Sequence, residues 1–212
     1  MVEMIKKYKI GKRRFGLINW VGAWTLYQKE VLRFLNVWAQ TIFSPLVSSL
    51  LFLMVLSLAI GDERGEVLGV PFIAFLAPGL IAMIQLFNGM QSSLSMVYDR
   101  EMGSMKTMLV SPIPRWFLLV SKLLAGVFVS ILQVYAFLLI ASFWNIIPPI
   151  SGYFTILPAL IFSGLMLGSL GMFLSSAIKQ LENFAGVMNF VIFPMFFASS
   201  ALYPLWKIEE TS

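Results

Sequence analysis

Long runs without a charged residue dominate the pattern of hydrophobic and polar positions along the chain. They cover residues 34–61, 67–98 and 123–178, and a last run begins near residue 184. An ionised side chain at the centre of a bilayer costs at least about 2.5 to 3.5 kcal/mol on insertion scales, so such runs predict membrane spans. Because a spanning helix needs about 20 apolar residues, the run 123–178 must hold two spans.

We predict five spans, near residues 37–60, 72–97, 117–143, 155–177 and 184–202. Trp144, Asn145 and Pro148 mark the break within the longest run, since turn and interface residues gather there. The spans should be helices, because backbone groups in lipid must be hydrogen-bonded internally and the segments are too long for barrel strands. Gly164 and Gly168 predict close helix packing, and we expect it within this bundle rather than at a moving contact with a second half of the assembly. The fold class is therefore an all-α, polytopic membrane bundle.

Residues 1–36 form a separate region ahead of the first span, with a basic tail followed by an amphipathic helix. Apolar residues recur at spacings of three and four, at Trp20, Trp24, Tyr27, Val31, Phe34 and Trp38, while Lys29, Arg33 and Asn36 lie on another face. This pattern predicts an interfacial helix in the headgroup layer, either a lever on the first span or a simple anchor. Residues 37–212 then form the transmembrane domain.

Composition supports lipid rather than water as the main surroundings. Of the 212 residues, 59% are hydrophobic and only 12% charged, whereas soluble domains carry about 25% charged residues. The net charge of +5 could indicate nucleic acid, but the basic residues crowd at the N-terminus without the interleaved aromatics of a nucleic-acid module. The chain has no Cys and no His, so we expect neither catalytic residues nor a metal site.

The distribution of Lys and Arg predicts the orientation. If the N-terminus is cytoplasmic, then of the 15 Lys and Arg residues only Arg64 and Lys207 fall on the outer side. Short cytoplasmic segments of membrane proteins carry such an excess of positive charge. We therefore predict a multi-pass protein of the plasma membrane with its N-terminus in the cytoplasm.

The loop between the second and third predicted spans, residues 98–116, is the most informative segment. Its first half can form a short helix, which Pro112 and Pro114 should stop before the third span. A cytosolic motor subunit could grip a short, charged projection of this kind. The charge pattern alone fits an ordinary connecting loop as well.

The same loop resembles a segment of ABC-2 type transporter permeases, in which an acidic residue, Gly, Ser or Thr, Leu and Ser/Thr-Pro precede a basic residue and a Lys. The matching residues are Glu101, Gly103, Ser104, Leu109, Ser111, Pro112, Arg115 and Lys122. A second stretch is similar to the family's Asn…Pro…Ser-Gly…Phe-Pro-Leu pattern, at Asn189, Pro194, Ser199, Ser200, Tyr203, Pro204 and Leu205. Ser200 replaces the usual Gly and Tyr203 the usual Phe. The resemblance covers nearly the whole chain in order.

This resemblance implies the permease subunit of an ATP-driven exporter of a hydrophobic or amphipathic compound or a lipid-linked glycan. It implies a separate ATP-binding-cassette subunit in the cytosol, docked at Arg100, Glu101, Gly103, Ser104, Leu109, Ser111 and Pro112. It also implies a second permease half, identical or homologous, and an outer-segment motif at Asn189, Pro194, Ser199 and Pro204. This chain would bind no cofactor and hydrolyse no ATP, because the ATP site belongs to the partner.

Two alternatives remain open at this stage. Family permeases have six spans, so a chain with five is either a truncated or split gene product, with an inactive permease as one alternative, or a true five-span variant. We expect truncation, since the missing portion should begin near Pro204. The other alternative is a secondary transporter driven by an ion gradient. Such a transporter normally needs ionisable groups inside the bundle, and the predicted spans carry none away from their ends.

Overall fold

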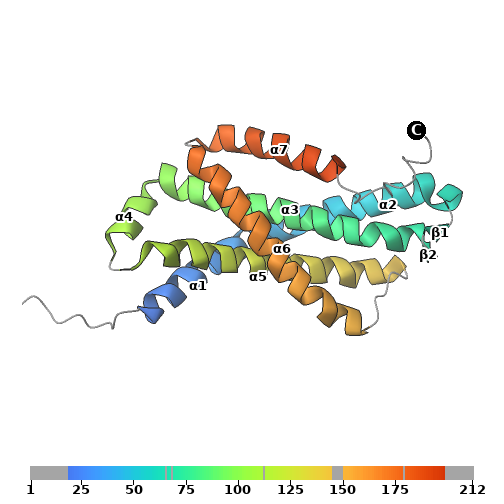
Figure 1. Cartoon of the computed structure of the whole chain (residues 1–212), viewed down its shortest axis with the longest axis horizontal. Helices are drawn as coiled ribbons and strands as arrows, with labels where there is room; N and C mark the ends of the chain where they lie inside the picture. The colour runs from blue at the N-terminus through green and yellow to red at the C-terminus, as the bar shows by residue number, and fades with distance from the viewer. Residues whose placement is uncertain are drawn as a thin grey trace, which may run out of the picture.

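The computed structural model describes residues 19–64, 66–67, 69–111, 113–144, 150–178 and 180–198, which are almost entirely helical. The helices in chain order are α1 (Trp20–Asn36), α2 (Ser44–Arg64), α3 (Phe72–Glu101), α4 (Ser104–Val110), α5 (Arg115–Ala141), α6 (Ile150–Ala177) and α7 (Leu181–Ala198), as Figure 1 shows. A π-helical turn, Ala39–Phe43, leads into α2, and a 3-10 turn, Ser142–Trp144, follows α5. A small antiparallel hairpin, β1 (Glu66–Val67) and β2 (Val70–Pro71), joins α2 to α3.

Four segments of the described chain are long and apolar enough to cross a membrane: Ala39–Ala59, Phe72–Glu101, Arg115–Ala141 and Ser151–Ala177. They correspond to the first four predicted spans. The fifth, 184–202, falls on α7, whose apolar part, Asn189–Ala198, is shorter than a span, and residues 199–202 lie outside the described part. A multi-pass helical bundle is thus established, while the fifth span stays a prediction.

The loop after the second span differs from its predicted form. The sequence predicted a short helix in the first half of residues 98–116. The structure has a short helix in this loop, but α3 continues to Glu101, so the short helix α4 begins only at Ser104 and lies across the middle of the loop. Gly103, at φ +73°, separates the two helices, and glycine adopts this left-handed conformation without steric cost. Pro114 immediately precedes α5, as expected; Pro112 lies outside the described residues.

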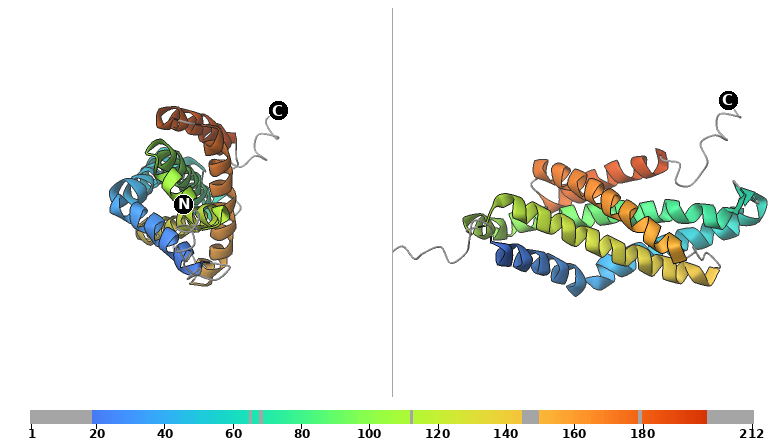
Figure 2. Two further views of the ribbon diagram at one scale, coloured as in Figure 1. Left: turned by 90° about the vertical axis from the view of Figure 1, so that its left-hand side faces the viewer. Right: turned by 60° about the horizontal axis from the view of Figure 1, so that its bottom comes forward.

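Helix α3 is the centre of the bundle, with α2, α5, α6 and α7 packed around it. Its buried residues Leu76, Leu80 and Ile84 share one core with Val134 and Phe137 of α5. Helix α6 crosses α3 and α5 obliquely (Figure 1), and in the views of Figure 2 α1 and α7 lie on opposite sides of the bundle. Most elements therefore depend on α3 for their position.

A buried polar network lies midway along α3. The Asn88 side-chain amide donates to Gln133 Oε1 at 2.9 Å, and Gln133 in turn donates to the backbone carbonyl of Thr41 in the π-helical turn. Gln133 is completely buried. Because polar groups without partners are costly in an apolar interior, this network fixes α3, α5 and the entry to α2 relative to one another.

Glycines of α6 allow close approach to α3 and α5. A Cβ at Gly171 would lie 2.0 Å from Ser93 Oγ and 2.9 Å from the backbone oxygen of Gly89. Gly164 and Gly168 face Val127 and Leu123 of α5 at 3.2 and 3.0 Å from the corresponding Cβ positions. Gly164 and Gly168 thus pack closely against α5, as predicted for helix packing within the bundle.

Substitution of Gly171 by Ala is expected to destabilise the fold, because the new methyl group would collide with backbone of α3 and not only with a movable side chain. Overpacking of this kind costs about 1 to 3 kcal/mol. Gly186→Ala in α7 is the matched control, because nothing lies within 4 Å of its Cβ position and Ala is the better helix former. Thermal unfolding in detergent should show a lower Tm for Gly171→Ala alone; equal Tm values for the two variants would contradict the close packing.

Candidate functional site

Nine charged residues gather at one end of the bundle, formed by α1, α4 and the adjoining ends of α3 and α5. They are Lys29, Glu30, Arg33, Asp99, Arg100, Glu101, Lys106, Arg115 and Lys122. We call this region the basic end; it lies to the left in Figure 1, where α1 and α4 are labelled. It contains both a buried ionic cluster and an exposed short helix.

The buried cluster is built around the ammonium group of Lys122 on α5. Lys122 Nζ donates to Asp99 Oδ2 on α3 at 2.6 Å, to Glu30 Oε1 on α1 at 2.9 Å and to Ser95 Oγ at 3.1 Å. The exposed fractions of the Lys122, Glu30 and Asp99 side chains are only 7%, 3% and 5%. One cation therefore joins three helices that are far apart in sequence.

Two further groups extend this cluster through Asp99. Arg33 of α1 donates to Asp99 Oδ1 at 3.0 Å and its guanidinium lies 4.7 Å from the ring centre of Tyr98. The Ser104 hydroxyl, at the start of α4, lies 3.2 Å from both Asp99 Oδ1 and the Asp99 backbone oxygen. Asp99 thereby connects α4 to the ion pairs. We refer to Glu30, Arg33, Asp99 and Lys122 as the Lys122 cluster.

Packing of α1 on α5 explains why Glu30 is buried. Phe34 lies on the same face of α1, one turn after Glu30, and packs with Ala125 and Val129 of α5. Tyr27, one turn before Glu30, adjoins the same apolar cluster, and its partial burial raises the pKa of its hydroxyl. Asn19 caps the helix by accepting a hydrogen bond from the Gly22 backbone N–H at 2.9 Å.

The energetics of this arrangement favour an all-or-none contact. Taking an ion out of water costs several kcal/mol. A buried ion pair recovers this free energy only when its geometry is good and further hydrogen bonds satisfy the remaining donors and acceptors of the two groups. The cluster holds two cations and two carboxylates, so its formal charge is zero. Loss of one residue of the Lys122 cluster leaves the charges of the others buried without a full set of partners. Helices α1, α3 and α5 cannot separate without breaking the ion pairs of this cluster.

Arg100 forms a second connection at the basic end. Its guanidinium donates to the backbone oxygens of Ser175, Ser176 and Ile178 at 3.3, 3.4 and 3.1 Å. These carbonyls lie at the C-terminus of α6, where helix carbonyls lack intrahelical partners and the helix dipole favours a cation. Arg100 therefore attaches the end of α3 to the end of α6.

Helix α4 presents its outer surface away from the rest of the chain. None of its residues is buried, and Val110 is 87% exposed and Leu109 42% exposed. Glu101 and Lys106 beside them are also exposed. An apolar tip flanked by charges is a surface suited to a protein partner.

The residues predicted for docking thus divide into two groups. Arg100 and Ser104 make contacts within the chain, while Glu101 and Leu109 face outward. Gly103 occupies the turn between the helices, with open space around it, and Ser111 donates to the Met108 backbone oxygen. Pro112 lies outside the described residues.

The predicted outer-segment residues are only partly covered. Asn189 and Pro194 belong to α7 and both are exposed. Ser199 and Pro204 lie outside the described residues.

Sequence reasoning missed the Lys122 cluster as a unit. Glu30 and Asp99 were not singled out, and the statement that charges stay at the ends of the spans was too coarse, because Lys122 lies seven residues after the start of α5. A signal was present, since an ionisable residue inside a predicted span marks a functional site and calls for a partner.

The described part of the chain offers no metal centre. No group of three or more His, Cys, Asp or Glu side chains is placed there to hold a metal ion. In the Lys122 cluster, both oxygens of Asp99 and Oε1 of Glu30 contact the Lys122 ammonium or the Arg33 guanidinium, whereas Glu30 Oε2 is buried without a hydrogen-bond partner.

Comparison with known proteins agrees with this architecture. The chain is 23% identical to the inner membrane transport permease YadH of Escherichia coli K12 over 201 residues, covering 90% of this chain and 77% of that protein. It is 25% identical to nodulation protein J of Rhizobium leguminosarum bv. viciae over 200 residues, which cover 90% of this chain and 73% of that protein. A probable multidrug ABC transporter permease of E. coli K12, YbhR, is 32% identical over 125 residues. These residues cover 56% of this chain and 33% of YbhR. No solved structure matches the chain.

The sequence profile of one family, described as ABC-2 type transporter, matches residues 22–211. This range includes α1, the four long apolar helices, the exposed α4 and the Lys122 cluster. Of the two relatives above that match over most of the chain, YadH is named an inner membrane transport permease and the other is named a nodulation protein. The chain is a multi-pass membrane transport permease of the plasma membrane and belongs to the ABC-2 type transporter family.

Proposed function

We propose that this permease is the membrane subunit of an ATP-driven exporter and that a separate ATP-binding-cassette subunit docks on α4 from the cytoplasm. The observation that carries the proposal is the position of α4, which is exposed on its outer side and joined through Ser104 to the buried Lys122 cluster. ATP is bound and hydrolysed in the partner, and this chain supplies the moving spans.

The Lys122 cluster gives movement of α4 a direct route to the spans. Ser104 bonds to Asp99 of α3, and Asp99 shares Lys122 of α5 with Glu30 of α1. A displacement of α4 therefore moves α1, α3 and α5 together, because separating them would strand buried charges. Arg100 carries the same displacement to α6 through its three carbonyl contacts.

In this proposal the basic end lies in the cytoplasm and α1 lies flat in the headgroup layer. The excess of Lys and Arg at this end supports the orientation. Trp20, Trp24 and Leu32 of α1 are 69%, 59% and 57% exposed, which suits a helix whose outer face contacts lipid. So placed, α1 acts as a lever between the headgroup layer and the first span.

The cargo and the second permease half belong to the same proposal. The cargo is a hydrophobic or amphipathic compound or a lipid-linked glycan, and the multidrug designation of the relative YbhR supports the first of these classes. A second copy or a homologue of the chain completes the pathway. Only 17% of the Ala39–Ala59 span and 22% of the Ser151–Ala177 span is buried within one chain, which leaves both available to lipid or to that second half.

Docking on α4 predicts a local sensitivity to charge. Val110→Asp places a carboxylate at the exposed apolar tip, and Glu101→Arg reverses the flanking charge, so each should reduce co-purification with the ATPase subunit about tenfold or more. Val70→Asp in β2 is the matched control, since Val70 is also exposed but lies at the opposite end of the bundle.

Co-purification in the same detergent measures all three variants against the native chain. If Val110→Asp and Glu101→Arg both retain the partner and support transport at native rates, α4 is not the docking element.

Loss of the Lys122 ammonium should weaken both the fold and transport. Lys122→Met leaves Glu30 without a strong partner and removes one of the two cations on Asp99, which is expected to cost about 3 to 5 kcal/mol of stability. The triple variant Lys122→Met/Glu30→Gln/Asp99→Asn removes the stranded charges and should recover most of this stability without restoring ATP-driven transport. Thermal unfolding and vesicle transport measure the two effects.

Lys29→Met serves as the control, because Lys29 is 45% exposed and its contact with Glu30 is 3.9 Å long. Exposed pairs of this kind contribute about 0 to 1 kcal/mol. A Lys122→Met protein as stable as Lys29→Met would show that the cluster does not hold the helices together. A triple variant that transports at the native rate would show that it does not couple them.

A further inference from the structure

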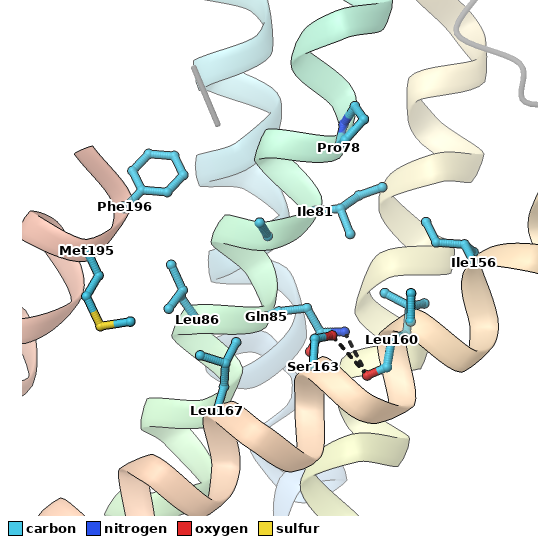
Figure 3. Close-up of a pocket in the computed structure, with 12 residues that line it drawn as sticks. Pro78, Ile81, Gln85, Leu86, Ile156, Leu160, Ser163, Leu167, Met195 and Phe196 are labelled. Atoms are coloured by element: carbon cyan, nitrogen blue, oxygen red, sulfur yellow. Dashed lines mark hydrogen bonds between the residues drawn. The ribbon is translucent and has the colours of Figure 1, made fainter. Parts of the chain in front are cut away.

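A polar pocket of about 310 Å³ lies beside the Lys122 cluster, between the end of α1, the π-helical turn and α3. It differs from the larger pocket between α3, α6 and α7 in Figure 3, which is mainly apolar and has no charged residue in its lining. Its lining combines polar and apolar side chains, among them Arg33, Gln40, Gln91, Tyr98, Phe34 and Leu94. This volume and a few convergent polar groups are typical of a small-molecule site.

Arg33 supplies the one positive charge among the described residues that line the polar pocket. A guanidinium has five N–H donors, and the described contacts of Arg33 use one of them, from Nη1 to Asp99 Oδ1 at 3.0 Å. The Arg33 side chain is 28% exposed and lies over the Tyr98 ring. The guanidinium therefore keeps donors for a phosphate group, which Arg binds in a bidentate geometry.

The charges around the polar pocket suit one added anion. The Lys122 cluster, which includes Arg33, is formally neutral. Lys29, one turn before Arg33 on α1, adds a positive charge on a side chain that is 45% exposed. The nine charged residues of the basic end comprise six cations and three carboxylates. A phosphodiester in the pocket would therefore lower an excess of positive charge.

Two carboxamides provide neutral hydrogen-bonding groups at the same pocket. The side chains of Gln40 and Gln91 make no hydrogen bond within the described part of the chain. Gln40 belongs to the π-helical turn Ala39–Phe43, and such turns are frequent at functional sites. A carboxamide both donates and accepts, so it matches a ligand hydroxyl. An ammonium headgroup has no counterpart, since no carboxylate is among the described lining residues and Arg33 covers the Tyr98 ring.

The polar pocket opens where headgroups meet hydrocarbon. Val37 and Tyr98 at its rim are 50% and 42% exposed, whereas Phe34 and Thr41 on its inner wall are 6% and 2% exposed. The first apolar span begins at Ala39, and aromatic side chains such as Tyr98 are enriched at the membrane interface. Basic pockets between spanning helices on the cytoplasmic side suit anionic lipid headgroups.

We infer that the polar pocket binds an anionic phospholipid with an uncharged hydroxyl headgroup, of the phosphatidylglycerol type. The lipid phosphate contacts Arg33, the headgroup hydroxyls contact Gln40 and Gln91, and the acyl chains continue into the hydrocarbon region beside the first span. The inference rests on the proposed position of the basic end in the headgroup layer. It requires neither an ATPase partner nor transport.

Equilibrium binding of tritium-labelled lipids to the delipidated full chain in detergent tests the site. The probes are phosphatidylglycerol and phosphatidylcholine with identical acyl chains. The native chain should bind phosphatidylglycerol about tenfold more tightly, the effect expected from one or two net hydrogen bonds. Unlabelled phosphatidylglycerol should displace the label, while millimolar inorganic phosphate should not, because it lacks the apolar part that the membrane-facing opening favours.

Opposite charges at one rim position connect the binding to this pocket. Gln40→Glu should lower the affinity for phosphatidylglycerol at least threefold and Gln40→Lys should raise it, because the new charge lies beside the phosphate. Gln91→Leu should lower it about three- to tenfold through loss of one amide. Gln28→Glu is the matched control, since Gln28 is exposed on α1 outside the pocket. Thermal unfolding of each variant confirms that the fold is retained.

Four results would overturn the inference. The first is equal affinity of the native chain for the two lipids. The second is unchanged binding in both Gln40→Glu and Gln91→Leu, as expected if the basic N-terminal residues held the lipid. The third is an equal loss of affinity in Gln28→Glu and Gln40→Glu, and the fourth is displacement of the lipid by inorganic phosphate. No ATPase subunit enters this measurement, so its failure is distinguishable from a failure of docking on α4.

Discussion

The buried ammonium of Lys122 is the interaction on which the basic end depends. It satisfies Asp99 of α3 and Glu30 of α1 at hydrogen-bonding distance from a position inside α5. A charge so far from water is stable only while these partners stay in place. Because Asp99 also receives Arg33 and Ser104, one cation holds α1, α3, α4 and α5 in a single arrangement. In the function proposed above, this constraint lets movement of the small exposed helix α4 reach the long spans.

The remaining polar and small residues serve the same central helix. Asn88 and Gln133 hold α3 to α5 midway along the bundle, and Gly171 brings α6 against α3. Arg100 joins the end of α3 to the end of α6 at the basic end. The side of α3 that faces α7 is different, since it leaves a mainly apolar pocket between α3, α6 and α7.

The spans could be predicted from the sequence because the cost of burying charge in lipid leaves a direct mark, the absence of charged residues over long runs. The same pattern could not place Glu30, Asp99 and Lys122 together, since they are 23 to 92 residues apart and their contact depends on which faces α1, α3 and α5 present. The turn at Gly103 also shifted the short helix to residues 104–110, because helix propensity alone did not reveal where α3 would end. The docking residues came from family resemblance, and the structure divides them into inward and outward groups.

The most direct test of the account is a pair of distances within the ATPase-bound permease. The chain has no Cys, so spin labels can be attached to cysteines introduced at exposed Gln28 and Leu124, on α1 and α5, and at Gln28 and Phe190, on α1 and α7. Electron paramagnetic resonance then measures both distances without nucleotide and with ATP trapped. The account predicts that the α1–α5 distance stays constant while the α1–α7 distance changes. A change in the α1–α5 distance as large as that between α1 and α7 would contradict it.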